Sequence, residues 1–145
     1  TRKTLARVPE AKFAWAPHPK SMNTHKLAAH LANLPSWVPM TLRQSELDIA
    51  GYKLPEPGSV AAILAHFDAG MAAALQAIEA TSDAGWMEPW TLKSGGQVAF
   101  TMPRIAVFRS MILNHNIHHR GQMTVYLRLL GVPVPALYGP SADEQ

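Results

Sequence analysis

The segment Asn114–Gln122, NHNIHHRGQ, contains three histidines within nine residues of an otherwise Leu-, Met- and Val-rich stretch. If this stretch is helical, His115 and His119 lie one turn apart, and this spacing lets two imidazoles converge on one metal ion. His118 points to the side. One face of the predicted helix repeats at spacings of three and four and includes both residues: Ile105, Phe108, Ile112, His115, His119, Gln122, Tyr126 and Leu129.

A third histidine, His30, has the same inward placement in the predicted helix that contains HKLAAHLANL. It shares one face with Leu27, Leu34 and Trp37, whereas His25 lies off that face. If the two helices face each other, three imidazoles meet and leave further coordination positions open to water or substrate. Nitrogen ligands of this kind suit Zn, Ni, Fe or Co, and the spacing does not rank these metals. The alternative interpretation is that these are hydrogen-bonded core histidines without a metal.

Other chemistries find less support in the same residues. The residue after His115 is Asn116, where the HExxH motif of zinc proteases has its glutamate base. The chain has no cysteine, which excludes a protein thiol nucleophile and cysteine-ligated zinc. Gln122 is a candidate buried amide that orients a ligand histidine. Gly121 is unfavourable inside a helix by about 1 kcal/mol relative to Ala, so it marks either a close helix approach beside the metal or a tolerated glycine. No catalytic side chain is identified.

Four predicted helices would position these histidines. The opening TRKTLARVPE lacks the apolar core of a signal peptide, and Thr1–Val8, closed by Pro9, has the pattern of the end of a first helix. The remaining three begin and end at capping or breaking residues: Asn23 or Thr24 to Pro35 or Pro39, Val60–Ala80 after the cap Ser59, and Pro103 to Gly131.

The segments between these helices are rich in polar residues, proline and glycine. We predict a loop for 41–58, with at most a turn of helix, and a long connection for 81–96, with at most a short β-like excursion rather than a sheet. The sequence therefore predicts an all-α protein, a four-helix bundle with long connections, forming a single domain over residues 1–145.

The composition indicates which partners and which cellular location to expect for the protein. The formal charge is +3, and the basic residues are scattered rather than gathered in a stripe, so we expect no nucleic-acid partner. No run of about 18–20 apolar residues is evident, so we expect no membrane span. A soluble cytoplasmic protein is the expectation.

Two segments resemble a known family. The run HNIHHRGQMTVYLRLLGVPVPALYG is similar to the signature of the DinB/YfiT-like metal-dependent enzymes, in which His-x3-His-Arg-Gly-Gln is followed by a Leu/Arg-rich helix end, a glycine stop and a tail with Pro and Tyr. WAPHPKSM followed by LAAHLANLPSW resembles the first connection and second helix of that family. The resemblance covers essentially the whole chain. This helical family is distinct from the DNA polymerase of the same name.

The resemblance implies a four-helix bundle, usually dimeric, in which three histidines bind a divalent metal. Carried over by position, these are His30, His115 and His119, the same three that the helical faces select. Family members of known activity join low-molecular-weight thiols to electrophiles as transferases or isomerases, and others are hydrolases. A metal with an open position would lower the pKa of a bound thiol or water and so create the nucleophile.

Two further expectations follow from the resemblance. A homodimer is expected, and the apolar connection with Trp86, Met87 and Trp90 is a candidate for its interface. The alternative function, of a different class, is a non-catalytic metal-binding protein, stress-associated or interacting with other proteins, on the same scaffold.

Overall fold

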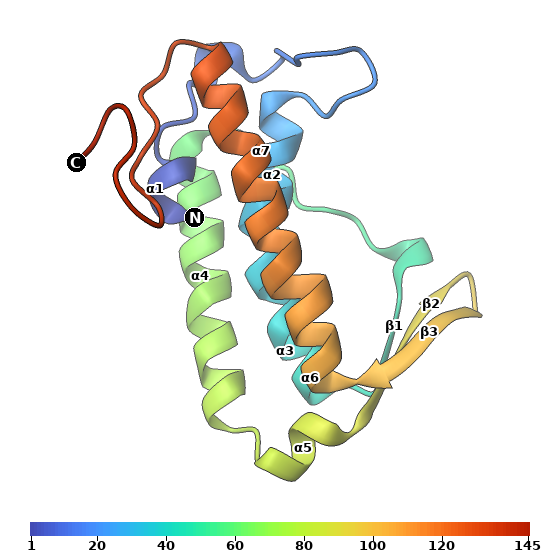
Figure 1. Cartoon of the computed structure of the whole chain (residues 1–145). Coiled ribbons are helices and arrows are strands. Elements are labelled where there is room, and N and C mark those ends of the chain that lie inside the picture. Colours follow the sequence, from blue (N-terminus) through green and yellow to red (C-terminus); the bar gives the residue numbers. More distant parts are fainter.

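Three helical runs form the body of the protein in the computed structural model, which describes residues 1–145 (Figure 1). Two of the runs change helix type along their length, whereas the middle run, α4, is continuous. In chain order the helical elements are α1 (Arg2–Leu5), η1 (Glu10–Lys12), α2 (Thr24–Asn33), η2 (Leu34–Ser36), α3 (Trp37–Arg43), η3 (Ile49–Gly51), α4 (Val60–Glu79), α5 (Asp83–Met87), α6 (Arg104–Val107), the π-helical η4 (Phe108–Asn114) and α7 (His115–Leu129).

The main helices begin and end close to the predicted positions. The side chain of Asn23 accepts a hydrogen bond from the backbone N–H of Lys26 at the start of α2. Ser59 does the same for Ala62 at the start of α4. Gly131 follows α7 with a φ of 70°, a left-handed conformation that ends a helix and that glycine adopts without steric cost. These caps fix the lengths of the helices that carry the histidines.

The predicted all-α class is wrong, because a three-stranded sheet stands beside the helices. Its strands are β1 (Glu46–Asp48), β2 (Pro89–Ser94) and β3 (Gln97–Pro103). The order is β1-β2-β3, with β1 parallel to β2 and β2 antiparallel to β3. β1 and β2 lie in segments predicted to be loops, and β3 ends at Pro103, where the last helix was predicted to begin. In Figure 1 the β2–β3 hairpin projects from the lower end of the helical body.

Two sequence features explain the sheet. Gly95 and Gly96 have φ values of 60° and 80°, and two successive positive φ values form the tight turn that antiparallel strands favour. Trp90 and Leu92 alternate with more exposed residues, and their side chains are buried against Val107 of α6. The hairpin is therefore stabilised by its turn and by one apolar face.

The main core lies where α2 packs against both α4 and α7. Its most buried members, exposed by 1% or less, come from these three helices and from α1: Leu5, Leu27, Ala28, Leu31, Ala32, Ile63, Met123 and Leu127. By contrast, α4 and α7 pack mainly on the helices between them rather than on each other. The helical body is thus fully packed on its α2 side.

Helix α4 departs from the sequence expectation in two respects. Phe67 is buried, but Met71 and Leu75, which follow it at the helical spacing typical of one inward face, are 37% and 53% exposed. In addition, α4 is long and apolar enough to span a membrane by length and composition, contrary to the expectation that no segment is. A single helix of this kind is weak evidence for a span, since an Ala-rich core helix has the same composition, and α4 packs against α2 and α3 along one side.

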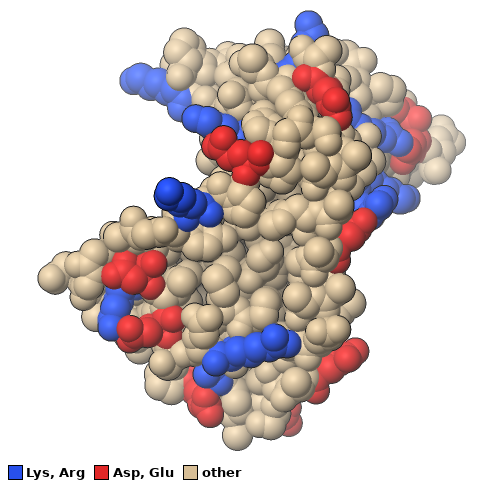
Figure 2. Space-filling view, turned by 180° about the vertical axis from the view of Figure 1, so that it is seen from behind, with Lys and Arg blue, Asp and Glu red and all other residues tan.

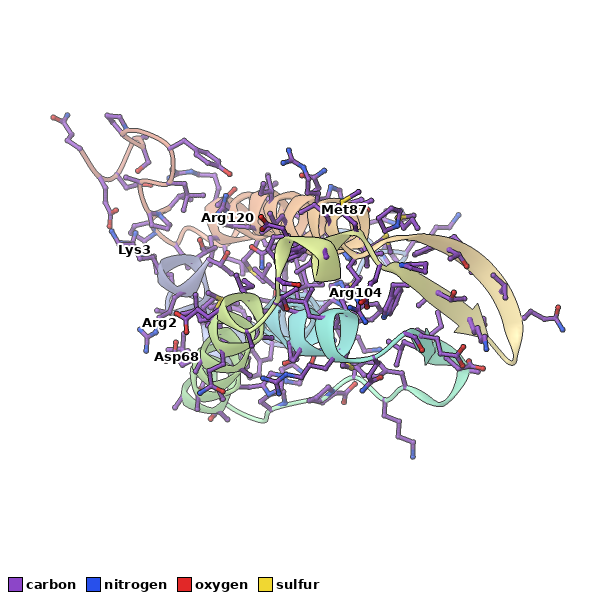
Figure 3. All side chains as sticks on the ribbon, turned by 90° about the horizontal axis from the view of Figure 1, so that it is seen from below. Arg2, Lys3, Asp68, Met87, Arg104 and Arg120 are labelled. Carbon is purple, nitrogen blue, oxygen red and sulfur yellow. The ribbon has the colours of Figure 1, made fainter.

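Charged residues of both signs are interspersed on the surface. Figure 2 shows Lys and Arg near Asp and Glu at both ends of one face, with a broad band of other residues between them. Arg104, labelled in Figure 3, connects several elements, because its guanidinium donates to Glu88 and to the backbone carbonyls of Gly85 and Gln44. It ties the start of α6 to α5 and to the end of α3.

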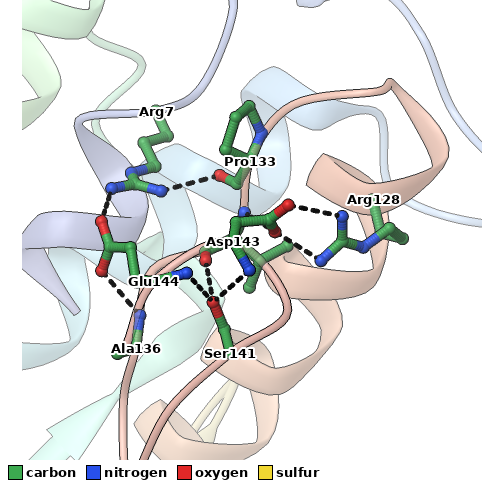
Figure 4. Close-up of polar contacts among 8 residues, drawn as sticks. Arg7, Arg128, Pro133, Ala136, Ser141, Asp143 and Glu144 are labelled. Atoms are coloured by element: carbon green, nitrogen blue, oxygen red, sulfur yellow. Dashed lines mark hydrogen bonds and ion pairs between the residues drawn. The ribbon is translucent and has the colours of Figure 1, made fainter.

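Ion pairs fold the C-terminal tail back onto the helices (Figure 4). Arg7 pairs with Glu144, and Arg128 of α7 pairs with Asp143. The hydroxyl of Ser141 accepts hydrogen bonds from the backbone N–H groups of Asp143 and Glu144. The tail is therefore fixed against both the first residues and α7.

Candidate metal site

Three imidazoles converge between α2 and α7. The Nε2 atoms of His30 and His115 lie 3.1 Å apart, and those of His115 and His119 lie 2.8 Å apart. All three ligand atoms lie within 4.8 Å of one another. Nitrogens that share one ion at about 2.0–2.1 Å are separated by no more than roughly 4.2 Å, so the observed Nε2 separations of adjacent rings fit a common ion. The structure thus brings together the three residues selected from the sequence.

Hydrogen bonds to the other ring nitrogen fix the tautomers of two of these histidines. Nδ1 of His119 lies 2.7 Å from Oε1 of Gln122, as assigned, and a carboxamide oxygen can only accept. Nδ1 of His115 lies 3.2 Å from the carbonyl oxygen of Met111, which also only accepts. Both rings therefore carry their proton on Nδ1 and present an unprotonated Nε2 to the centre. This is the arrangement in which outer partners orient metal-ligating histidines.

Burial favours the neutral form of two of these imidazoles, His30 and His119. Burial, followed by the neighbouring His119 and His115, lowers the pKa of His30 to about 4. The pKa of His119 is also lowered, mainly by burial, although its hydrogen bond to Gln122 acts in the opposite direction. Near pH 7 these two rings are neutral, and neutral imidazole is the form that binds metals.

The donor set fits a divalent cation. With Nδ1 protonated on both rings, the Nε2 lone pairs of His115 and His119 face each other at 2.8 Å with no hydrogen between them. Such an arrangement is repulsive unless a cation lies between the nitrogens. No carboxylate or thiol belongs to the cluster, so imidazole nitrogen is the only protein donor. Imidazole donors suit Zn, Cu, Fe and Ni better than Mg or Ca.

The remaining histidines lie outside this cluster. His118 is exposed, and its ring contacts that of His119 from the side. His25 bonds the carbonyl of Pro57, and His66 of α4 bonds the side chain of Asn33. His18 accepts a backbone hydrogen bond in its loop. The separation of inward from outward histidines on the predicted helices therefore matches the structure.

Two features of the site differ from or add to the sequence analysis. A Cβ placed on Gly121 would meet nothing within 4 Å, so no helix approaches closely there and the tolerated glycine is the correct alternative. The Met111 carbonyl that orients His115 was missed, because a backbone acceptor leaves no signal in side-chain types. It belongs to the π-helical turn η4, which ends directly before His115. Such turns occur frequently at functional sites.

The three residues expected at a dimer interface differ in how far they are buried within the chain. Trp90 is fully buried within the chain, and Trp86 packs against Phe108. Only Met87 of the three is largely exposed, at 64%. Trp90 cannot contribute to an interface, because it is a core residue of the sheet.

Comparison with known families identifies the scaffold. The DinB superfamily matches residues 1–123, which include all three histidines. The chain belongs to the DinB superfamily. A Bacillus subtilis protein, YrdA, is 52% identical over 33 residues, a segment that spans 23% of this chain and 20% of YrdA. Because the match covers so little of YrdA, it carries no activity over to this DinB chain.

Solved structures of DinB-like proteins share the fold. One from Bacillus subtilis, YjoA, superposes with a TM-score of 0.71 at 14% identity, covering 99% of this chain and 90% of its own. Another, from Bacillus cereus, gives a TM-score of 0.65 at 23% identity and covers 94% of this chain and 87% of its own. At these identities the likeness concerns the fold. DinB membership and the three-histidine cluster are together compatible with metal binding.

Proposed function

We propose that this DinB protein binds one divalent metal ion through Nε2 of His30, His115 and His119 and is an enzyme that acts on small molecules. The observation that carries the proposal is the convergence of the three Nε2 atoms, with those of His115 and His119 2.8 Å apart while Nδ1 of each ring bonds an oxygen outside the cluster. With the Gln122 amide oxygen directed at Nδ1 of His119, the two facing Nε2 atoms have no proton to share, and a cation between them satisfies both lone pairs.

The reaction class we propose is transfer of a low-molecular-weight thiol to an electrophile, or hydrolysis. A bound metal would lower the pKa of a coordinated thiol or water and so provide a nucleophile near neutral pH. The chain has no cysteine, so the thiol would be a substrate rather than a protein group. Three protein ligands leave positions for it, as in other catalytic sites with three histidines.

The residues of the chain itself have defined tasks in this proposal. His30 connects a second helix to the site, because it comes from α2 whereas the other two ligands come from α7. Gln122 and the Met111 carbonyl hold the Nδ1 protons of His119 and His115, which keeps both Nε2 atoms available. A cytoplasmic location and a homodimer complete the proposal, and both rest on analogy with the family.

A spectroscopic experiment tests metal and thiol binding at once. The purified chain is loaded with Co²⁺. Glutathione, mycothiol and bacillithiol are then added in turn, each alone and with an electrophile, and a simple ester is added separately. Thiol entry at an open position should produce a thiolate-to-cobalt charge-transfer band, and one thiol–electrophile pair should show metal-dependent turnover. His118→Ala is the matched control that should behave like the original chain.

Three outcomes distinguish the possibilities. A charge-transfer band with turnover supports the enzyme. Metal binding without thiol or ester turnover indicates the alternative function, a metal-binding protein without catalysis. Failure to bind Co²⁺, Zn²⁺ or Ni²⁺ at all contradicts the proposal.

A further inference from the structure

The two helical runs that carry the three histidines contain no acidic residue. Residues 24–43 form α2, η2 and α3, and residues 104–129 form α6, η4 and α7. All 10 aspartates and glutamates of the chain lie outside these runs. The runs do contain basic residues, namely Lys26, Arg43, Arg104, Arg109, Arg120 and Arg128. The helices around the histidine cluster therefore have an excess of positive charge.

The cluster itself adds to this excess once it holds a metal. Imidazole binds metals in its neutral form, and no carboxylate or thiol belongs to the cluster, so a divalent ion there keeps both of its positive charges. A thiolate on the ion would neutralise only one of them. Surrounding positive charge that no protein group balances attracts anionic ligands. The charge balance thus favours a ligand with a second negative group.

Lys26 is placed to bind such a group. It lies four residues before His30 on α2, so the Cβ atoms of the two side chains are roughly 5–6 Å apart on one face of the helix. Lys26 is exposed, and its ammonium takes part in none of the ion pairs of the chain. It is therefore a free cation one helical turn from a metal ligand.

The other basic residues of the two runs are occupied or lie elsewhere. Arg104 and Arg128 form ion pairs with carboxylates of other segments. Arg120 lines an apolar groove of about 550 Å³ between α4 and the η4–α7 run, and none of the three histidines lines that groove. Arg43 ends α3, roughly 20 Å along the run from His30 at about 1.5 Å per residue. Arg109 is not at a helical spacing that shares a face with a ligand.

Gln122 provides a second donor at the same edge of the cluster. Its Oε1 lies 2.7 Å from Nδ1 of His119, which leaves its amide NH₂ without a partner in the chain. Because α2 and α7 run in opposite directions, one turn before His30 and one turn after His119 lie toward the same end of the helix pair (Figure 1). At about 100° per residue, Lys26 and Gln122 also lean to the same side of the line between the helices. An ammonium and an amide NH₂, both exposed, thus flank one edge of the cluster.

We propose that Lys26 and the Gln122 amide bind a carboxylate of the substrate, so the thiol that this site accepts is one that carries a carboxylate group. Charge-assisted hydrogen bonds from an ammonium to a carboxylate are stronger than neutral ones. With the sulfur directed to the histidine cluster and the carboxylate at Lys26, the molecule is held at two points. This inference rests on the proposed function, because it names the class of thiol.

Three small thiols that differ in charge test the inference. Mercaptopropionate, mercaptopropanol and cysteamine are titrated into the Co²⁺-loaded chain, and the thiolate-to-cobalt band gives each dissociation constant. Lys26→Gln should weaken binding of mercaptopropionate by about fivefold and leave that of mercaptopropanol unchanged, with cysteamine bound no more weakly than before. Lys26→Arg should restore most of the loss. Chelation of the metal by both groups of mercaptopropionate would not depend on Lys26, so the variants separate the two effects.

Two further variants serve as control and as confirmation. Arg43→Gln removes one positive charge from the same run at a distance and should change no thiol affinity. Gln122→Glu keeps the acceptor for Nδ1 of His119 but replaces the NH₂ donor by an oxygen, so it should weaken mercaptopropionate relative to mercaptopropanol. Glutamine at position 26 is compatible with the fold, since glutamine is favourable at the third residue of a capped helix.

The outcomes separate this inference from the proposed function. If thiols bind but Lys26→Gln leaves mercaptopropionate unchanged, or weakens mercaptopropanol equally, the carboxylate site is wrong and the proposed function stands. If no thiol gives the band, the proposed function fails, and succinate is compared with butyrate through the visible Co²⁺ spectrum. A preference for succinate that Lys26→Gln abolishes would support the carboxylate site without the thiol, and no preference would overturn it. A chain that binds no Co²⁺ overturns both.

Discussion

The two sides of α7 differ in what holds their side chains in place. On one side His115 and His119 are positioned by a carboxamide, a backbone carbonyl and the facing α2. On the other side Leu113 and Ile117 project, half-exposed, into a groove. A polar ligand is oriented by specific hydrogen-bond partners within the fold, whereas an apolar side chain needs only apolar surface to pack against. The histidine side is thus fixed by polar contacts within the fold, whereas the side chains on the groove side remain half-exposed.

The largest effect should come from removing a ligand. In His119→Ala one of three nitrogen donors is lost, so metal affinity should fall by well over the 10–100-fold that is typical for loss of an outer partner. Metal content after dialysis and competition with a chromophoric chelator measure this. His118→Ala is the matched control, since His118 is an exposed neighbour outside the cluster, and its affinity should be unchanged. Retention of metal by His119→Ala together with its loss in His118→Ala would show that the ligand assignment is wrong.

A smaller effect is expected when the support of a ligand is removed. Gln122→Leu leaves all three imidazoles but removes the acceptor of the His119 Nδ1 proton, so the tautomer and ring orientation are no longer fixed. We expect metal affinity to fall by about 10–100-fold. Gln122→Glu keeps an acceptor oxygen and should restore most of the affinity. Because Gln122 is exposed, neither change should alter the Tm of the metal-free protein; a large Tm loss would instead point to a structural role.

The low pKa of His30 predicts a pH-dependent stability of the metal-free protein. Its pKa is about 4 in the folded state and about 6.5 in the unfolded state, so between these values the unfolded state binds more protons. The contribution of neutral His30 to the free energy of unfolding is therefore complete above pH 6.5 and is lost as the pH falls toward 4. After a discount for partial exposure, the free energy of unfolding should drop by roughly 1–2 kcal/mol between pH 7 and pH 4.5.

Urea unfolding at both pH values measures this drop, and His30→Gln is the control. The glutamine does not titrate, so the variant should lose clearly less stability on acidification than the original chain. An equal loss in both proteins would mean that His30 does not cause the pH dependence.

The same contrast explains what could be read from the sequence. His30, His115 and His119 were found because helical spacing alone decides which side chains face inward, and the helices carrying them have clear caps at Asn23 and Gly131. Contacts of this kind depend on local periodicity. Gln122 was found because it lies one turn from His119, but it was expected to be buried and is exposed.

The sheet and the groove depend on non-local packing, and the sequence analysis missed both. Residues 89–103 alternate around Gly95 and Gly96, a hairpin signal, but β1 is only three residues long and pairs with β2 from a distant part of the chain. Similarly, Met71 and Leu75 have the periodicity of a buried face and are nevertheless exposed. Periodicity predicts which face is apolar but not whether another element covers it.

The smallest expected effect concerns Gly121, which belongs to neither of the contrasted sides of α7. It lies inside the helix, its φ is not positive, and an added Cβ would meet no atom within 4 Å. Alanine at this position should therefore keep the native contacts and reduce the freedom of the unfolded chain, which stabilises the fold by about 0.5–1 kcal/mol. Urea unfolding of Gly121→Ala measures the gain, and chelator competition should show unchanged metal affinity. The matched control is Gly131→Ala, which should destabilise the protein because Gly131 has a φ of 70°. Loss of metal from Gly121→Ala would mean that this position contacts the site after all and would weaken the distinction between a supported histidine side and the rest of the helix.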